Sequence, residues 1–265
     1  MIRLIAADLD GSLLPDDKRV PEEFFRLLPE LEKRGISFFT ASGRTFHTLY
    51  HNFAPVADRI GYICENGACV VMDGKTIISH TINPVRAQGI FEAAKLLPDV
   101  QLVLCGKKSA YHLDYPQRFH EHIMSYHVNH TVISDYAQAR DEFYKIAVCD
   151  LRGPENNSFP FFKERFGQEF GMFISGKYWM DIMVPSVNKG KALAQIQQLL
   201  SVHPDETLAF GDYYNDVELL QQAGYGYVMK NAADGMKKHA KLITPHTNNE
   251  NGVLEVIRKH VFGES

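Results

Sequence analysis

Two aspartates, Asp8 and Asp10, end an apolar segment near the start of the chain and are followed directly by Gly11. Residues 2–8 are typical of a buried strand. Its carboxyl end would deliver both acids into a crevice, because ligands of open α/β sheets bind at that edge. Two carboxylates so close repel each other when both are ionised, and a divalent cation or a shared proton relieves that repulsion. The pair therefore indicates a hard-metal site, a nucleophile with an acid/base partner, or both.

Three further polar segments lie where predicted strands end or helices begin. They are residues 40–44 (TASGR), which join a strand to a helix, residues 188–191 (NKGK), which open a helix, and residues 211–216 (GDYYND), which follow an apolar strand. Each alone has an ordinary explanation: a Ser-Gly pair caps a helix, a lysine in a first helical turn is usually solvated, and a Gly-Asp turn after a strand is common. Only their combination points to chemistry.

The acids of these segments form a candidate metal site. Asp8, Asp212 and Asp216 offer oxygen ligands that suit one Mg²⁺, and a substrate phosphate and water would complete its octahedron. Lys189 adds a positive charge for the same phosphate.

The remaining polar groups complete a set for phosphoryl transfer. Ser42 and the amide of Gly43, at a helix start, can donate to phosphate oxygens. Asp8 is then placed to attack phosphorus, and Asp10 to protonate the leaving alcohol. Phosphoryl transfer depends mainly on positioning and charge neutralisation, which this set supplies.

Strand-like and helix-like segments alternate at both ends of the chain, which predicts a doubly wound, mostly parallel α/β sheet. A hairpin is expected over residues 70–78, with Asp73-Gly74 at its turn. The other predicted strands of this core are residues 2–8, 36–41, 60–64, 207–210 and 225–229. Its predicted helices are residues 21–33, 45–53, 189–200, 217–222 and 250–260.

The middle of the chain shows paired strands, which predict a separate α+β domain inserted into the core. We expect a core of residues 1–83 and 186–265 and an insert of residues 84–185, with Pro84 and Pro185 at the crossings. Its predicted strands are residues 101–105, 110–113, 143–149, 171–175 and 178–184, the last two joined by a turn at Ser175-Gly176-Lys177. Its predicted helices are residues 85–97, 117–126 and 155–166.

Composition narrows the class of protein. The 265 residues are 45% hydrophobic, which is typical of a folded chain with a sizeable core. A formal net charge of −4 does not indicate a nucleic-acid-binding protein. No apolar run is long enough to span a bilayer. The N-terminus opens directly into a strand, so no signal peptide is expected. The four cysteines show no paired zinc motif, so we expect reduced thiols in a cytoplasmic protein.

The order of these motifs resembles that of the Cof-type phosphatases of the haloacid dehalogenase superfamily, which carry a large inserted cap domain of the C2 type. The resemblance covers nearly the whole core. It also includes residues 65–68 (ENGA), 144–146 (YKI), 187–190 (VNKG) and 229–232 (MKNA). It implies a Rossmann-like core and a substrate that is a sugar phosphate or a phosphorylated cofactor.

The same resemblance implies a role for each residue of the site. Asp8 would be the nucleophile that forms an aspartyl-phosphate, and Asp10 the acid/base. Ser42 and Lys189 would bind phosphate, and Asn215 would touch it. Mg²⁺ would be held by oxygen atoms of four acids: Asp8, Asp10 through its backbone carbonyl, Asp212 and, in support, Asp216.

Two positions depart from the family's pattern. Ser12 stands where threonine is usual, which keeps the hydroxyl group. Tyr213 stands where a small residue is common, and a phenol beside the metal site could narrow the pocket or reach the substrate. The second departure therefore bears on the substrate more than on the chemistry.

Several other polar residues have two interpretations. Arg44 could meet an anionic substrate or form a salt bridge on the helix surface, and Asp181 could project toward the site or be exposed. We favour a solvated or substrate-facing surface over a zinc site for four histidines of the insert, because the i, i+2 spacing of the first two separates them on a helix. These histidines are His120, His122, His127 and His130.

We therefore expect a Mg²⁺-dependent phosphatase of a small phosphorylated metabolite, with the insert as a lid that selects the substrate and excludes water. A sugar phosphomutase would use the same aspartyl-phosphate and return the phosphoryl group to the sugar. A signalling module would carry phospho-aspartate without turnover, although receiver domains lack a large insert and the paired Asp8/Asp10 turn. The fold does not identify the substrate, and the sequence leaves the oligomeric state open.

Overall fold

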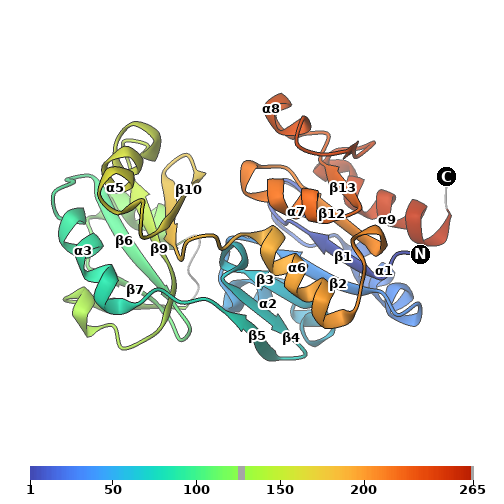
Figure 1. Cartoon of the computed structure of the whole chain (residues 1–265), viewed down its shortest axis with the longest axis horizontal. Helices are drawn as coiled ribbons and strands as arrows, with labels where there is room; N and C mark the ends of the chain where they lie inside the picture. The colour runs from blue at the N-terminus through green and yellow to red at the C-terminus, as the bar shows by residue number, and fades with distance from the viewer. Residues whose placement is uncertain (125–128, 264–265) are drawn as a thin grey trace. The chain divides into compact units, whose positions relative to one another are not determined.

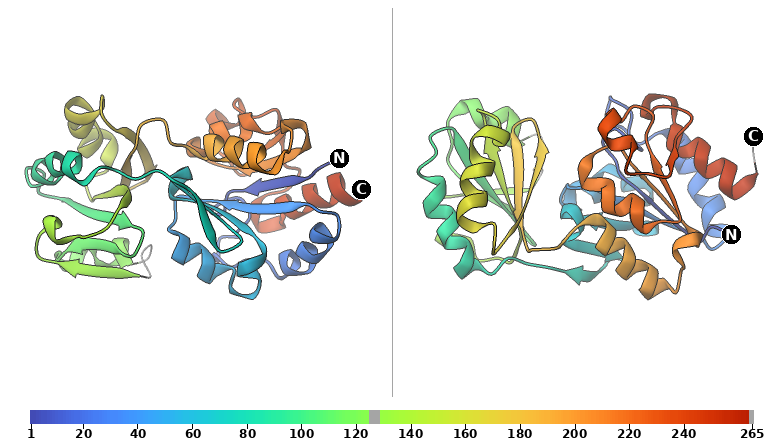
Figure 2. Two further views of the ribbon diagram at one scale, coloured as in Figure 1. Left: turned by 60° about the horizontal axis from the view of Figure 1, so that its bottom comes forward. Right: turned by 45° about the horizontal axis from the view of Figure 1, so that its top comes forward.

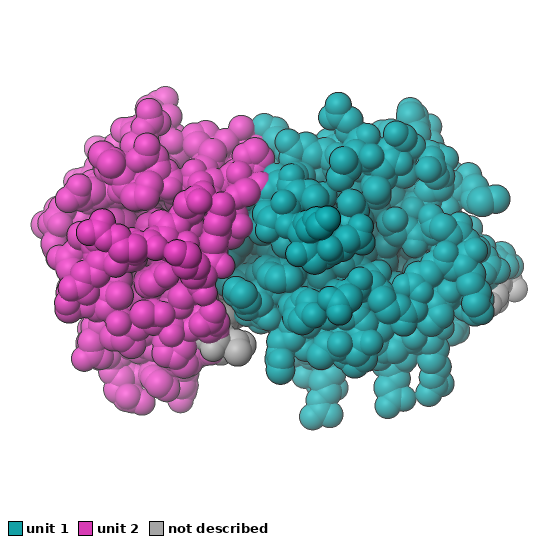
Figure 3. Space-filling model, turned by 90° about the horizontal axis from the view of Figure 1, so that it is seen from below, with its two compact units in different colours: residues 1–78, 188–265 teal, residues 79–187 magenta. Residues whose placement is uncertain are grey.

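The computed structural model describes residues 1–124 and 129–263 (Figure 1). The chain divides into two compact units (Figure 3), which are residues 1–78 with 188–265 (unit 1) and residues 79–187 (unit 2). Each unit is built on its own sheet. The inserted unit is therefore somewhat longer at both ends than the predicted 84–185. In the described part of the chain, no helix has both the length and the apolar character that a membrane span needs.

Unit 1 is built on a sheet with the strand order β14-β13-β12-β1-β2-β3-β4-β5. The pairs from β14 to β3 are parallel, and β3 pairs antiparallel with β4. This arrangement confirms the predicted doubly wound, mostly parallel sheet. The strands are β1 (Leu4–Ala7), β2 (Ser37–Ala41), β3 (Gly61–Cys64), β4 (Cys69–Met72), β5 (Lys75–Ser79), β12 (Thr207–Gly211), β13 (Tyr225–Val228) and β14 (Leu242–Ile243).

Helices cover both faces of this sheet: α6 and α7 lie on one face, and α1 and α2 on the other (Figure 2). On α1 the buried side chains are Phe24, Leu27, Leu28 and Leu31, the spacing of one apolar helix face. The predicted bounds of α6 and α7 are those observed, whereas α8 and β14 were not predicted. The helices are α1 (Glu22–Lys33), α2 (Phe46–Asn52), α6 (Lys189–Leu200), α7 (Val217–Gln222), α8 (Asp234–Lys237) and α9 (Gly252–Phe262).

The hairpin between β4 and β5 turns at the predicted pair. Asp73 and Gly74 both have positive φ, 50° and 68°, which a two-residue type I′ turn requires.

Unit 2 is built on a sheet with the order β10-β11-β9-β6-β7-β8. Its neighbouring strands pair antiparallel, except for the parallel pair of β7 and β8. Its strands are β6 (Val100–Gly106), β7 (Ala110–Leu113), β8 (His130–Ile133), β9 (Phe143–Asp150), β10 (Gly171–Gly176) and β11 (Trp179–Met183), and its helices are α3 (Pro84–Ala94), α4 (His120–Met124) and α5 (Ser158–Phe166). Apolar residues of α3 and α5 pack against β6, β9 and β11 to form its core.

Two details of unit 2 correct the sequence analysis. Gly176 pairs with Trp179, so the turn between β10 and β11 is made by Lys177 and Tyr178 rather than being centred on Gly176. Strand β8 was not predicted, because its burial does not follow the strict alternation of a half-buried strand. The end of the predicted helix 117–126 lies outside the described residues.

Candidate active site

The candidate site lies at the carboxyl ends of three neighbouring strands. Strand β1 is the centre, because Ala7 is in register with Phe210 of β12 on one side and with Thr40 of β2 on the other. The residues that follow these strands therefore emerge at one edge of the sheet. Asp8, Asp212 and Ser42 are among them, at the place where ligands bind in folds of this kind.

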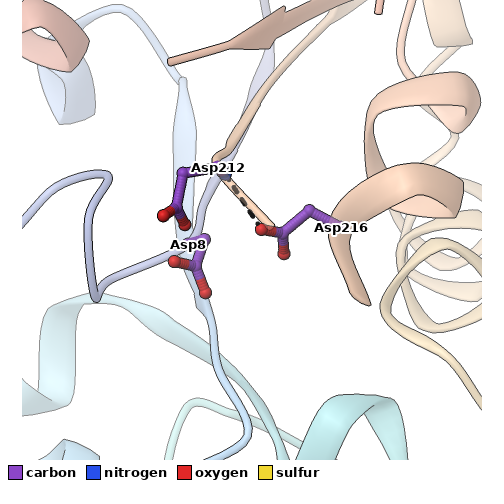
Figure 4. Close-up of side chains that lie close together, drawn as sticks. All are labelled: Asp8, Asp212 and Asp216. Carbon is purple, nitrogen blue, oxygen red and sulfur yellow. Dashed lines mark hydrogen bonds between the residues drawn. The ribbon is translucent and has the colours of Figure 1, made fainter. Parts of the chain in front are cut away.

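Three acids converge at this edge. Figure 4 shows Asp8, Asp212 and Asp216 directed toward a common region, and their ligand oxygens all lie within 4.8 Å of one another. Asp216 is completely buried, and its Oδ2 accepts hydrogen bonds from the backbone N–H of Asp212 at 3.1 Å and of Tyr213 at 3.2 Å. Asp216 therefore fixes the backbone that carries Asp212 and also adds a negative charge to the cluster.

Lys189 supplies the positive charge of the cluster. Its Nζ donates to Asp8 Oδ1 at 2.7 Å and to Asp216 Oδ1 at 2.6 Å, and its side chain is fully buried. The cap of α6 sets this position, because the Asn188 side chain accepts a hydrogen bond from the N–H of Lys191 and starts the helix at Lys189. The usual solvated environment of a lysine in a first helical turn does not apply here.

Burial and mutual repulsion set the electrostatics of the acids. Burial and the charge of Asp216 raise the pKa of Asp8 well above its ordinary value, although Lys189 acts in the opposite direction. Burial and the charge of Asp216 raise the pKa of Asp212 to about 7. Burial alone would lower the pKa of Lys189, but the charges of Asp216 and Asp8 outweigh it and raise that pKa. The excess of buried carboxylate oxygens fits a hard divalent cation.

Asp10 forms a separate cluster of charges. Both of its oxygens accept hydrogen bonds from Arg44, from Nε at 2.9 Å and from Nη2 at 2.8 Å, and Lys18 Nζ lies 2.9 Å from Oδ1. Burial would raise the pKa of Asp10, but the charges of Arg44 and Lys18 and their hydrogen bonds lower it. Arg44 thus forms a partly buried ion pair with Asp10 inside the site. The sequence analysis had considered a contact with an anionic substrate or a salt bridge on the helix surface, but not this pair. Nothing in the sequence pattern singled out Lys18.

The predicted phosphate-binding residues meet around a short loop after β3. The Ser42 Oγ accepts a hydrogen bond from the N–H of Arg44 at 3.2 Å, and a Cβ atom added to Gly43 would lie 3.2 Å from the amide of Asn66. Asn215 Nδ2 donates to Asn66 Oδ1 at 3.1 Å. The structure therefore brings Ser42, Gly43 and Asn215 to one side of the site through Asn66, a residue that had no predicted role.

The loop after β1 approaches Asp212 closely. Gly11 has a φ of +82°, and a Cβ atom there would lie 2.3 Å from Asp212 Oδ2, so only glycine fits. Asn231, from the MKNA motif, donates through Nδ2 to the Gly11 carbonyl at 2.8 Å. Tyr213, the residue after Asp212, is 44% exposed, and its ring packs edge-on against that of Tyr214.

Asp181 and two of the four histidines, His122 and His130, have partners within unit 2. Asp181 is buried and pairs with Lys145 on the neighbouring strand at 3.3 Å, so it is neither exposed nor an isolated acid. The ring nitrogens of His130 and His112 lie 3.1 Å apart, and the ring of His122 packs against Tyr178. His127 lies outside the described residues, and a substrate-facing role for the histidines stays a prediction.

Comparison with known proteins identifies the family. The sequence profile of the family described as haloacid dehalogenase-like hydrolase matches residues 5–257. The chain belongs to this family. It is 31% identical to the 5-amino-6-(5-phospho-D-ribitylamino)uracil phosphatase YbjI of Escherichia coli (strain K12), over 97% of this chain and 96% of that protein.

Further relatives agree with this membership. The chain is 25% identical to the 5-amino-6-(5-phospho-D-ribitylamino)uracil phosphatase YcsE of Bacillus subtilis (strain 168), over 98% of this chain and 96% of that protein. It superposes on the crystal structure of SMU.1108c from Streptococcus mutans UA159 with a TM-score of 0.90 and 25% identity, covering 99% and 100% of the two chains. The predicted family, a Cof-type phosphatase of the haloacid dehalogenase superfamily, and the predicted enzyme class, a phosphatase, are confirmed.

Proposed function

We propose that this haloacid dehalogenase-like phosphatase hydrolyses a small phosphorylated metabolite with Mg²⁺, through an aspartyl-phosphate on Asp8. The observation that carries the proposal is the cluster of Asp8, Asp212 and Asp216, in which the buried carboxylates of Asp8 and Asp216 both bind the ammonium of Lys189. Such a cluster concentrates negative charge where a metal and a phosphoryl group can both be bound.

The donor set fits Mg²⁺. Asp8 and Asp212 would be the side-chain ligands, the backbone carbonyl of Asp10 would be a third, and Asp216 would support them from behind. When bound, the cation offsets the repulsion among the acids and the charge of the phosphate oxygens. It also favours the ionised form of Asp8, whose pKa burial otherwise raises.

The proposed reaction has two displacements at phosphorus. A carboxylate oxygen of Asp8 forms a bond to phosphorus while the bond to the ester oxygen breaks, and Asp10 gives that oxygen its proton. Water then attacks the same phosphorus, Asp10 takes the proton from that water, and the bond to Asp8 breaks to release phosphate. Arg44 and Lys18 stabilise the ionised form of Asp10. This form accepts the proton of the water in the second displacement, whereas the same two cations disfavour the protonated form that the first displacement requires.

The other residues bind and orient. Lys189 holds Asp8 through a hydrogen bond of 2.7 Å, which fixes the direction from which the carboxylate attacks. Ser42, the amide of Gly43 and Asn215 would donate to phosphate oxygens. The family resemblance favours a sugar phosphate or a phosphorylated cofactor as substrate, and two relatives are named as phosphatases of a phosphoribitylamino-uracil. That compound is the first to test.

The decisive experiment compares the wild type with Asp8→Asn and, as a control, Asp17→Asn, which changes an exposed aspartate of the same loop. Release of inorganic phosphate from p-nitrophenyl phosphate and from a panel of phosphorylated metabolites is measured with Mg²⁺. We expect Asp8→Asn to lose turnover with an unchanged circular dichroism spectrum, and Asp17→Asn to keep both. Near-normal turnover in Asp8→Asn would eliminate the nucleophile assigned here. Isomerised sugar phosphate without phosphate release would instead indicate a mutase.

A further inference from the structure

The loop η2 (Glu65–Gly67) takes no part in the proposed reaction, yet its backbone is unusual. Its three residues have consecutive positive φ values of 49°, 53° and 98°. Non-glycine residues rarely adopt this left-handed region, and they keep it only where the surrounding structure enforces it. Asparagine tolerates it better than most residues do. The contacts of the loop must therefore hold it in this conformation.

The loop is tied by its backbone to the segment that contains Ser42. The N–H of Asn66 donates to the Ser42 carbonyl at 3.0 Å, and the N–H of Glu65 donates to the Arg44 carbonyl at 3.1 Å. The Asn66 amide also lies against the Cα of Gly43, where an added Cβ would be 3.2 Å from both of its polar atoms. Two residues of the loop therefore contact three consecutive residues of this segment, Ser42, Gly43 and Arg44.

The loop also reaches two segments from the far end of the sequence. Asn66 is buried, and its Oδ1 accepts a hydrogen bond from Asn215 Nδ2 at 3.1 Å. Gly67 lies so close to the start of α6 that a Cβ atom would be 2.4 Å from the Asn188 carbonyl oxygen. One loop therefore contacts the segments that carry Ser42, Lys189 and Asn215.

We propose that Asn66 is a positioning residue that holds the Ser42–Gly43 segment and Asn215 together as one phosphate-binding surface. This inference rests on the proposed function, because it takes these residues to bind the phosphoryl group. Asn66 meets the requirements of the position: its backbone adopts the left-handed conformation, and its short amide reaches Gly43 and Asn215 at once. A larger side chain would displace the Gly43 segment, and a shorter one would leave Asn215 without this acceptor.

The test uses Asn66→Gly, because glycine keeps the left-handed backbone accessible while removing the amide. Asn251→Gly is the matched control, since Asn251 also has a left-handed φ, of 60°, at the start of α9. Binding of inorganic phosphate is measured by calorimetry with Mg²⁺, together with kcat, KM and the melting temperature. We expect Asn66→Gly to weaken phosphate binding and to raise KM about tenfold, whereas Asn251→Gly leaves both unchanged.

A double-mutant cycle with Asn215→Ala separates positioning from general loosening of the structure. If Asn66 acts through Asn215, the double variant binds phosphate about as weakly as the worse of the two single variants. The proposal is overturned if the losses of phosphate affinity in the two single variants multiply in the double variant, because the two residues then act independently. It is also overturned if Asn66→Gly binds phosphate as tightly as the wild type. If Asn66→Gly does not fold, Asn66→Ser is measured against the same expectations. A wild type that releases no phosphate would reject the proposed function, whereas an active wild type with a normal Asn66→Gly rejects this inference alone.

Discussion

Lys189 is the side chain whose removal should have the largest effect on stability. Its ammonium lies between the carboxylates of Asp8 and Asp216, and all three groups are buried. Replacing one partner of a buried ion pair costs about 3–5 kcal/mol, because the remaining charge is left uncompensated. Since one ammonium here serves two carboxylates, we expect Lys189→Met to lower the free energy of unfolding by about 5 kcal/mol, the upper end of that range. This is a large share of the 5–15 kcal/mol that is typical of folded proteins.

The assay is urea unfolding followed by circular dichroism, at pH 7.5 with EDTA. Two conditions should reduce the loss of stability. Added Mg²⁺ replaces part of the missing positive charge. At pH 5.5, protons bind to the acids, because the pKa of Asp8 is raised and that of Asp212 is about 7. Lys191→Met is the matched control, since Lys191 is exposed on the same helix, and its stability should stay within about 0.5 kcal/mol of the wild type.

Two results would refute this reasoning. A loss below about 1 kcal/mol at pH 7.5 in EDTA, the size typical of an ordinary substitution, would show that the ammonium does not compensate the acids. An equal loss at pH 5.5 and at pH 7.5 would assign the effect to packing instead of charge. If Lys189→Met does not fold, adding Asp8→Asn should recover part of the stability, because one of the two uncompensated charges is then gone.

Two further predictions follow from the same cluster. In EDTA, the raised pKa of Asp212, about 7 against an ordinary 3.8, means that the folded state binds protons that the unfolded state has released. The free energy of unfolding should therefore fall as the pH rises from 5.5 to 8. If it falls as steeply in the Asp212→Asn variant as in the wild type, Asp212 is not the cause of the pH dependence. Gly11→Ala should lower kcat/KM at least about tenfold and weaken Mg²⁺ binding measured by calorimetry, since its Cβ would meet Asp212 Oδ2 at 2.3 Å. The control Gly35→Ala, with a similar φ of +67° but nothing within 4 Å, should keep full activity and lose only about 1–2 kcal/mol of stability.

Most elements of unit 1 could be predicted from the amino-acid sequence, with the exception of α8 and β14, and so could several residues of the candidate site. Helices α6 and α7 begin and end as predicted, and the Asp73-Gly74 turn was identified from its residue types. Apolar periodicity, caps and turn residues act over a few neighbouring positions, so they can be recognised without knowing what packs against them. The same holds for Asp8 and Asp10, which stand out because two acids directly follow an apolar strand.

Which side chains become partners could be seen only in the folded structure. The sequence predicts that Lys189 binds phosphate, but it does not indicate that Lys189 also lies between Asp8 and Asp216. The hydrogen bond to Asp8 joins residues 181 positions apart. The pairing of Asp10 with Arg44 and the contact of Asn66 with Asn215 were likewise absent from any local pattern. The physical reason is that burial and partner choice depend on strands and loops that are distant in the chain. A lysine in a first helical turn is solvated or fully buried according to what the rest of the fold places beside it.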